Sequence, residues 1–181
     1  MKKLPEGNVQ TPEFRAAFPY VFKPRPSDDP DKKAKYEVVM LFPKDVDLSA
    51  LKKAVTDMMT AKFGPDKTKW PKGRNPFRDG DEFQNLTGYP GHTFVSAKSV
   101  RPVGVVDESC QIITDESGFY PGVYARAIVC PYWYDAKGNK GIAFFLNGIQ
   151  RTKHGERMIN TPKPEEMFAP VEGAAAEDDG F

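Results

Sequence analysis

Apolar residues along the chain gather in short runs, and the spacing within each run predicts the element that it forms. Residues 17–23 and 35–42 are typical of strands, and the second run is apolar on both faces after Glu37, which indicates a central strand. In residues 47–63 the apolar positions recur every three or four residues, as in a helix that packs on one face. The aspartate at its start can cap this predicted helix, and Gly64 ends it.

The second half of the chain continues the strand pattern. Short strands are expected at residues 92–100, 103–106 and 111–113. The strongest hairpin has arms at residues 122–135 and 142–153, rich in β-branched and aromatic residues, around a turn centred on Gly138 and Asn139. Residues 64–91, rich in proline and glycine, predict a long irregular connection. Five or six strands and one helix predict a mainly β protein, a small Greek-key barrel or sandwich.

The composition excludes several classes of protein. Of the 181 residues, 39% are hydrophobic and 28% are charged, which suffices for one domain with a modest core. No apolar stretch reaches the length of a membrane span, and the first residues lack the apolar segment of a secretory signal. Two cysteines, Cys110 and Cys130, cannot form a disulfide framework or a zinc site, and we expect both to be buried, unreactive thiols. An intracellular protein without membrane contact is expected.

The net charge of +1 hides an uneven distribution. Residues 165–181 contain six acidic residues and no lysine or arginine, which leaves 26 basic against 19 acidic residues, or +7, over residues 1–164. We therefore expect a folded domain at residues 1–164 followed by a disordered acidic tail. A basic body suggests a polyanionic partner, with the tail as a tethered competitor. A solvated surface with a solubilising tail is the alternative.

Catalytic motifs are scarce in this sequence. It contains no phosphate-binding loop, nucleophile elbow or zinc-protease motif, and its two histidines, His92 and His154, lie in turn-like surroundings. An acidic cluster at Asp79, Asp81 and Glu82 is the one candidate metal site, and it would suit a metal-dependent nuclease. Three acids beside a glycine are also ordinary turn chemistry, so no catalytic residue, metal or cofactor is expected.

Residues 67–78 alternate cations with aromatic rings. Phosphates attract lysine and arginine, whereas unpaired bases stack on flat rings, so this mixture is typical of single-stranded nucleic-acid binding. The candidate contacts in this segment are Lys69, Trp70, Lys72, Arg74, Phe77 and Arg78. The alternative is a surface loop whose two rings pin it to the core.

One face of the predicted hairpin offers a second candidate surface. Strand alternation sends one set of residues toward the core, namely Val123, Ala125, Ala127 and Val129. With the turn centred as above, the opposite face carries Tyr124, Arg126, Tyr132, Phe145, Arg151 and Lys153. We expect the two tyrosines of this face to stack on bases and its cations to contact phosphates. Half-buried core tyrosines are the alternative.

The chain closes on Glu177, Asp178, Asp179, Gly180 and Phe181. A terminal phenylalanine offers a ring and an α-carboxylate to a pocket with a basic rim, and the acids before it provide electrostatic steering. We expect the acids and Phe181 to recruit a partner protein. An adaptor that uses this tail and never touches DNA is a further alternative.

The tail resembles the tails of replicative single-stranded-DNA-binding proteins of bacteria and phages, and the body is similar to one phage-encoded family of them. The similarity rests on blocks that follow one another in order through most of residues 36–157. Among these blocks are Tyr36-Glu-Val-Val-Met-Leu-Phe-Pro43, Asn75-Pro-Phe-Arg-Asp-Gly-Asp-Glu82, Gly91-His-Thr-Phe-Val-Ser-Ala-Lys-Ser99, Tyr120-Pro-Gly-Val-Tyr124 and Leu146-Asn-Gly-Ile-Gln150.

The resemblance implies an oligonucleotide/oligosaccharide-binding (OB) fold, a Greek-key barrel of five to six strands with one α-helix and long loops. It implies a protein that coats single-stranded DNA in phage replication and recombination, largely without sequence specificity, in the cytoplasm of the infected bacterium. Phage or host replication proteins would be recruited through the tail. Weaker binding of duplex DNA or RNA is left open.

Overall fold

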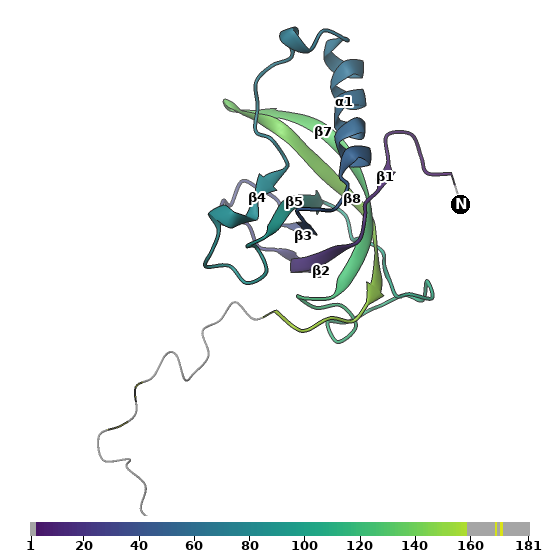
Figure 1. Ribbon diagram of the computed structural model, residues 1–181, viewed down its shortest axis with the longest axis vertical. Coiled ribbons are helices and arrows are strands. Elements are labelled where there is room, and N and C mark those ends of the chain that lie inside the picture. The colour runs from purple at the N-terminus through teal and green to yellow at the C-terminus, as the bar shows by residue number, and fades with distance from the viewer. Residues whose placement is uncertain (1–2, 159–168, 170, 172–181) are drawn as a thin grey trace, which may run out of the picture.

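Five long strands pair with one another in a ring (Figure 1). They are β2 (Phe14–Arg25), β3 (Lys35–Pro43), β5 (His92–Ser99), β7 (Tyr124–Ala136) and β8 (Asn139–Lys153). The pairings run β2–β3–β5–β8–β7 and back to β2, and all are antiparallel except β5–β8. The β5–β8 and β2–β7 links are each only two residue pairs long, so the ring is less regular than a closed barrel.

The computed structural model describes residues 3–158, 169 and 171. The tail residues singled out from the sequence, Glu177, Asp178, Asp179 and Phe181, lie outside the described residues, as does the domain boundary expected after residue 164. The disorder and partner binding predicted for the tail therefore stay predictions.

Short elements extend the ring at its edges. The two-residue strands β1 (Val9–Gln10), β4 (Arg78–Asp79) and β6 (Val105–Val106) pair with β7, β5 and β8 respectively. Two 3₁₀ turns, η1 (Lys67–Lys69) and η2 (Gly80–Glu82), interrupt the long connection before β5. The predicted strand at residues 111–113 is only an isolated bridge between Val106 and Ile112. The prediction of a mainly β fold with one α-helix is confirmed.

The helix α1 (Ser49–Phe63) begins and ends close to the predicted positions. The Asp47 carboxylate accepts a hydrogen bond from the Ser49 backbone N–H at 2.9 Å, one residue before the N-cap itself. Gly64 ends the helix in the left-handed region at φ 88°, where a residue without a side chain is favoured. Among the described residues, no helix combines the length and the hydropathy that a membrane crossing requires.

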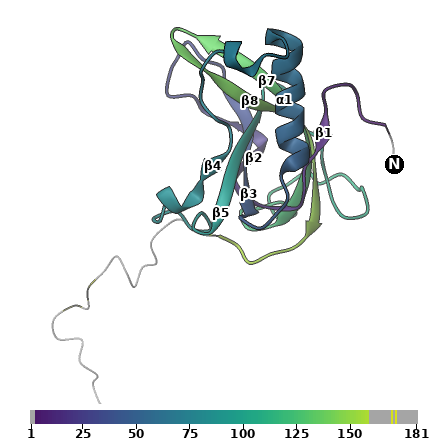
Figure 2. The same cartoon turned by 45° about the horizontal axis from the view of Figure 1, so that its top comes forward.

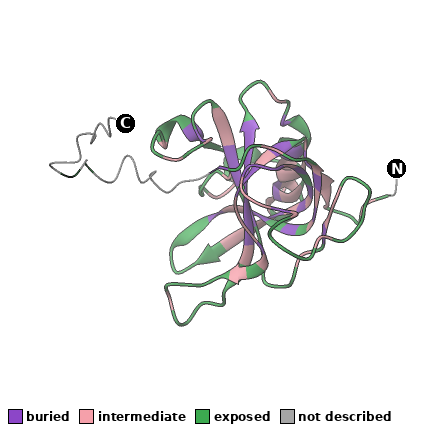
Figure 3. Ribbon diagram, turned by 90° about the horizontal axis from the view of Figure 1, so that it is seen from below, coloured by how far each residue is buried: buried purple, intermediate pink, exposed green. Residues whose placement is uncertain are grey.

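The strand β3 is buried on both of its faces. Residues 38–42 are at most 8% exposed, and β3 pairs with β2 on one side and β5 on the other, which confirms the prediction of a central strand. Its inner face packs into the main core, together with inner residues of the other strands and Leu51 of α1. Its outer face, at Val39 and Leu41, packs against a smaller cluster that includes Tyr89, Phe94 and Met158. Figure 3 shows the buried positions on the central elements and the exposed ones on the loops.

The hairpin of β7 and β8 turns one residue earlier than predicted. The turn residues are Lys137 and Gly138, with φ of 50° and 81°, and Ala136 pairs with Asn139. Two consecutive positive φ values match the twist of the flanking strands. The end of α1 packs beside this hairpin (Figure 2). There the rings of Phe63 and Trp133 meet edge to face at a centroid distance of 5.5 Å.

A register shift within this hairpin changes the face of one predicted site residue. Ile128 pairs with Gly148 and Val129 with Leu146, so Asn147 is an extra residue in β8. Beyond this bulge Arg151 lies opposite Ala125, on the buried side. The prediction that Arg151 shares a face with the hairpin tyrosines is therefore wrong, because a bulge shifts the alternation by one position.

Other parts of the hairpin prediction are confirmed. The predicted core residues Val123, Ala125, Ala127 and Val129 are all buried. Phe145 stacks on Tyr132 and lies on the predicted face. Lys153 also lies on that face, with its amine over the Tyr124 ring, because a second register shift at Thr152 reverses the effect of the first.

Gly122 provides a test of how the segment after β8, at residues 154–158, is anchored. Its φ is 109°, and an added Cβ would lie 2.0 Å from the Glu156 carbonyl oxygen. We expect Gly122→Ala to lower the free energy of unfolding by more than about 1 kcal/mol, because it adds a steric clash to a strained backbone. Urea denaturation would measure this, with Gly104→Ala as the control, since a Cβ there meets nothing within 4 Å. Equal midpoints for the two variants would contradict the predicted clash.

Candidate nucleic-acid interface

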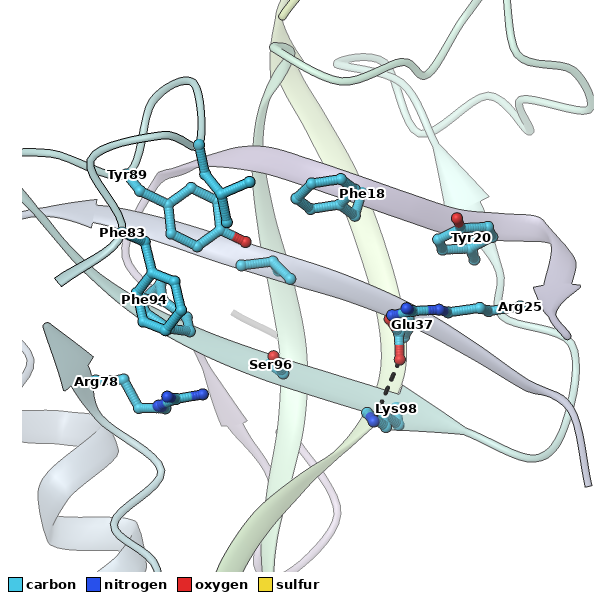
Figure 4. A pocket seen from close by; sticks show the side chains of 12 residues that line it. Phe18, Tyr20, Arg25, Glu37, Arg78, Phe83, Tyr89, Phe94, Ser96 and Lys98 are labelled. Carbon is cyan, nitrogen blue, oxygen red and sulfur yellow. Dashed lines mark hydrogen bonds and ion pairs between the residues drawn. The ribbon is translucent and has the colours of Figure 1, made fainter. Parts of the chain in front are cut away.

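A groove of about 350 Å³ lies on the outer face of β2, β3 and β5 (Figure 4). Its lining joins aromatic and charged side chains from three strands and from the connection before β5. The residues are Phe18, Tyr20, Arg25, Glu37, Val39, Arg78, Phe83, Leu86, Tyr89, Phe94, Ser96 and Lys98. In Figure 4 the aromatic rings of the connection close one end, and Arg25, Glu37 and Lys98 gather at the other.

A bulge in β2 brings two aromatic residues to this groove. Ala17 pairs with Val39 and Tyr20 with Glu37, so β2 has one residue more than β3 between these pairs. Phe18 takes a φ of 43°, which is uncommon for a side chain of its size. As a result Phe18 joins Ala17 in the outer cluster, and Tyr20 follows it along the groove.

The connection before β5 forms the closed end of the groove. The rings of Phe83 and Tyr89 pack on Phe94 at centroid distances of 5.3 and 4.9 Å. The chain passes so closely at Gly80 that a Cβ there would lie 2.0 Å from the Tyr89 carbonyl oxygen. Tyr89 is only 4% exposed, and burial, with a smaller effect of the negative charge of Glu37, raises the pKa of its phenol to about 12.

Cations of the groove lie against rings or against a buried acid. The Arg78 guanidinium lies 5.2 Å from the centroid of Phe83 and 5.1 Å from that of Phe94. Glu37 is 6% exposed and forms ion pairs with Arg25 at 2.9 Å and with Lys98 at 3.3 Å. The hydrogen bond to Glu37 raises the pKa of Arg25, which therefore stays charged.

These neighbours give the groove the chemistry that single-stranded nucleic acid requires. Flat rings accept unpaired bases, and exposed cations attract phosphates without reading the base sequence. The same face of an OB fold, over its second and third strands, is the usual oligonucleotide surface. In this chain those strands correspond to β3 and β5, because they follow β2 around the ring.

An aromatic surface on the hairpin lies beside the Lys98 end of the groove. Lys98 on β5 lies beside Phe145 on β8 in the parallel register, and both point outward. The Phe145 ring stacks on Tyr132 with centroids 3.9 Å apart and planes 16° apart. Phe145 is 45% exposed, so this stacked pair presents an aromatic surface next to the cation of the groove. One predicted site residue, Tyr132, thus lies beside the groove.

The predicted binding segment at residues 67–78 packs along the hairpin instead. The Trp70 indole N–H donates to the Gly64 carbonyl at 2.8 Å, and Phe77 meets the core residue Phe144 edge to face. The backbone of Arg74 bridges to Gly141 near the hairpin turn. Lys69, Lys72 and Arg74 are exposed on this segment, and Lys69 approaches Asp66 at 3.9 Å. Of the six predicted contacts in the segment, only Arg78 lines the groove.

A separate basic and aromatic surface lies at the base of the hairpin. The Tyr124 ring has the Lys153 amine 4.4 Å and the Arg15 guanidinium 5.8 Å from its centroid. Arg126 is exposed and donates to the Gln150 side chain at 2.8 Å. Tyr124 and Tyr132 are eight residues apart on one strand, or roughly 26 Å, so they do not share a single base-stacking site.

The buried Arg151 ties β8 to the loop before β7. It is 9% exposed and forms a two-pronged ion pair with Glu108, at 3.0 and 2.8 Å, and also donates to the Gly118 carbonyl. The hydrogen bonds from Arg151 lower the pKa of Glu108 to about 2. These contacts already occupy the guanidinium that the sequence suggested for phosphate binding.

The aspartates of the suggested metal site are bound by neighbouring groups of the protein. Asp79 and Asp81 both form ion pairs with Lys44, and Asp81 also accepts the Gly91 N–H at 2.7 Å. The N–H of Asp81 lowers the pKa of Asp79, and that of Gly91 lowers the pKa of Asp81, each with help from Lys44. Within the described part of the chain, no group of three or more metal-ligating side chains is assembled.

The histidines and cysteines show one departure from the sequence analysis. The His154 ring stacks on Tyr120, and the His92 ring meets the Pro90 carbonyl. Cys130 is half-buried, and burial raises the pKa of its thiol. Cys110 lies in the loop between β6 and β7 and is exposed, so the prediction of a buried thiol is wrong there.

Sequence reasoning missed most of the groove. Three separate stretches of the chain supply its residues Phe18, Tyr20, Arg25, Phe83, Tyr89, Phe94 and Lys98. Two signals were present in the sequence: one acid, Glu37, in an otherwise apolar strand, and the alternation of Phe94, Ser96 and Lys98. A buried acid requires cationic neighbours, so Glu37 points to the cations around it.

The family comparison matches residues 7–181 to the model described as Enterobacter phage Enc34, ssDNA-binding protein. No curated protein matches the chain. Among solved structures, the bacteriophage Enc34 single-stranded-DNA-binding protein in complex with ssDNA has 22% sequence identity and a TM-score of 0.71, covering 87% of this chain and 96% of that one. The single-stranded-DNA-binding protein gp2.5 of bacteriophage T7 has 14% identity and a TM-score of 0.59, covering 91% and 99%. These likenesses confirm the OB-like fold expected from the sequence.

The Arg151–Glu108 pair predicts a dependence of stability on pH. The pKa of Glu108 is about 2 in the folded protein and near 4.5 without the pair, so the stabilisation is complete above about pH 4.5 and is lost as the pH falls toward 2. Because this carboxylate is well exposed, we expect only about 1 kcal/mol of stability to be lost in this way.

Urea unfolding of Glu108→Gln between pH 5 and pH 2 checks this expectation. The variant should lose less stability over that interval than the unaltered chain, by about 1 kcal/mol. Glu116→Gln, the same change in the same exposed loop, should behave like the unaltered chain. Parallel pH profiles for Glu108→Gln and the unaltered chain would contradict the assignment.

Proposed function

Since the chain belongs to the family of the Enterobacter phage Enc34 single-stranded-DNA-binding protein, we propose that it binds and coats single-stranded DNA in phage replication and recombination. We expect it to act in the cytoplasm of the infected bacterium. The observation that carries the proposal is the groove on the outer face of β3 and β5, which combines aromatic rings with cations that stay exposed.

In this proposal the strand crosses the groove with its phosphates along the cations and its bases toward the rings. Arg25, Arg78 and Lys98 attract the phosphates, and Tyr20 stacks on a base. The Tyr132–Phe145 pair extends the track beyond Lys98. The exposed cations of residues 67–78 and the Tyr124 surface remain proposed outer contacts.

Base stacking explains why we expect little sequence specificity and a preference for single strands. Every base has a flat face, so rings accept all four bases about equally. In a duplex the same faces are already stacked and hidden, and only the phosphates reach the protein. Duplex DNA should therefore bind more weakly and through the cations alone.

We propose a binding protein rather than an enzyme. The carboxylates of the suggested nuclease site, Asp79 and Asp81, are held by Lys44 and by backbone N–H groups. A catalytic metal ion would have to displace these partners before it could bind.

We further propose that the acidic tail serves two purposes. Its acids compete with DNA for the basic body at low salt, and Glu177, Asp178, Asp179 and Phe181 recruit phage or host replication proteins. The charges support this proposal, because residues 1–164 carry +7 and the tail carries six acids without a basic residue.

Fluorescence anisotropy with a labelled oligo-dT and a duplex of equal length tests the function and its location. We expect tighter binding of the single strand, weakening as salt rises. Tyr20→Ala should weaken binding by about 1–3 kcal/mol, the usual contribution of one stacked base. The salt slope is the slope of the logarithm of the affinity against the logarithm of the salt concentration. Arg78→Ala should reduce its magnitude by about 0.7, the value for one phosphate on a single strand.

Two further variants are measured in the same titration, the first as a control and the second as a test of another surface. Lys53→Ala removes an exposed cation of α1 that pairs with Asp57, and it should leave binding unchanged. Tyr124→Ala tests the surface at the base of the hairpin. A larger effect of Tyr124→Ala than of Tyr20→Ala would move the DNA path to that surface, and equal binding of duplex and single strand would reject base stacking.

A chain ending at residue 164 tests the competing tail. Removal of six acids should raise the affinity for oligo-dT at low salt, and the gain should disappear as salt screens the charges. The comparison is made against the full chain over the same salt series. An unchanged affinity at every salt concentration would leave the tail with partner recruitment alone.

A further inference from the structure

An acid occupies the floor of the groove that we propose for a polyanion. Glu37 lies on β3 and, among the residues that the structure describes, is the one acidic side chain that lines the groove. Figure 4 shows it between Arg25 and Lys98, with its carboxylate toward both. A carboxylate here repels every phosphate that approaches, so its presence requires a reason.

Both carboxylate oxygens of Glu37 have a cationic partner. Oε1 accepts from Arg25 Nη1 at 2.9 Å, and Oε2 lies 3.3 Å from Lys98 Nζ. The side chains of Arg25 and Lys98 are 56% and 48% exposed, whereas that of Glu37 is 7% exposed. The two cations therefore bridge the buried acid and the solvent from which DNA arrives.

Fold stability does not account for this acid. Residues 38–42 of the same strand are apolar and buried, and an apolar residue at position 37 would avoid the desolvation of a charge. Buried ion pairs are often no more stable than well-packed apolar residues of similar size. The acid is therefore better explained by what it does to the cations of the groove.

We propose that Glu37 is the internal counterion of the DNA groove. The inference rests on the proposed function and concerns its regulation. Without DNA, Glu37 holds Arg25 and Lys98 at the groove. With DNA, it neutralises one unit of their charge, so the strand is held by less net charge than the cations alone would supply. The acid limits affinity and allows the bound strand to be released.

The substitution Glu37→Gln separates this role from a structural one. Glutamine keeps the shape and can still accept the hydrogen bond of Arg25, but it removes the charge. The magnitude of the salt slope for oligo-dT should rise by about 0.7. The ratio of the affinity at about 0.1 M salt to that at about 1 M salt should therefore be roughly fivefold larger for the variant than for the unaltered chain. Glu37→Asp, which keeps the charge, should bind with the slope of the unaltered chain.

A matched control and a second background complete the experiment on the full-length chain. Glu82→Gln removes an exposed acid near the groove that has no ion pair within the described residues, and its slope should change less than that of Glu37→Gln. In the single variant Glu37→Gln, Arg25 loses its acidic partner. The experiment is therefore repeated in an Arg25→Gln background, where that unpaired charge is absent, and Glu37→Gln should again steepen the slope. Thermal unfolding of each variant confirms that the domain is folded.

The outcomes separate the two proposals. A steeper slope and tighter binding in both Glu37→Gln backgrounds support the internal counterion. An unchanged or shallower slope in the folded variants overturns this inference and leaves DNA binding intact. Absence of oligo-dT binding by the unaltered chain overturns the proposed function, and the inference falls with it.

Discussion

The structure depends on a strand that is buried on both faces. The inner face of β3 completes the main core, and its outer face is covered at one end by Tyr89, Phe94 and Met158. At the other end these side chains no longer cover the strand. There the outer face carries Glu37, which is paired with Arg25 and Lys98. A groove results because the cover is partial: Phe83, Tyr89 and Phe94 form one end with Arg78 beside them, and Tyr20 lies with Arg25, Glu37 and Lys98 at the other.

Charge and aromatic surface are coupled throughout this region. Arg78 lies against two rings, Arg25 lies near Tyr20, and Lys98 lies beside Phe145. A cation over a ring face is attracted by the ring and keeps its outer side hydrated. A nucleotide brings a phosphate and a flat base about one sugar apart, so neighbouring cations and rings match its two halves. The surface suits a chain of nucleotides rather than one particular base.

Local patterns predicted the elements, and long-range details decided the site. The central strand, the helix and the inner face of β7 follow from apolar spacing, which is a property of neighbouring residues. The groove depends on the bulge at Phe18 and on the packing of Tyr89 over β3, which join distant parts of the chain. Arg151 was placed on the wrong face because no residue type marks the bulge at Asn147. In residues 67–78 the cations are exposed as expected, but Trp70 and Phe77 are partly held by the fold.

Met158, which precedes the tail in the sequence, is held in place by the fold. Its side chain packs into the cluster with Tyr89 and Leu41, and its N–H donates to the Pro121 carbonyl at 2.9 Å. Another 23 residues follow it in the sequence. In the competition proposed for the tail, the tether gives the tail an effective concentration of about millimolar at the body, which depends on tether length and not on how much protein is present. In the proposed competition, dilution therefore weakens the binding of DNA but not the binding of the tethered tail.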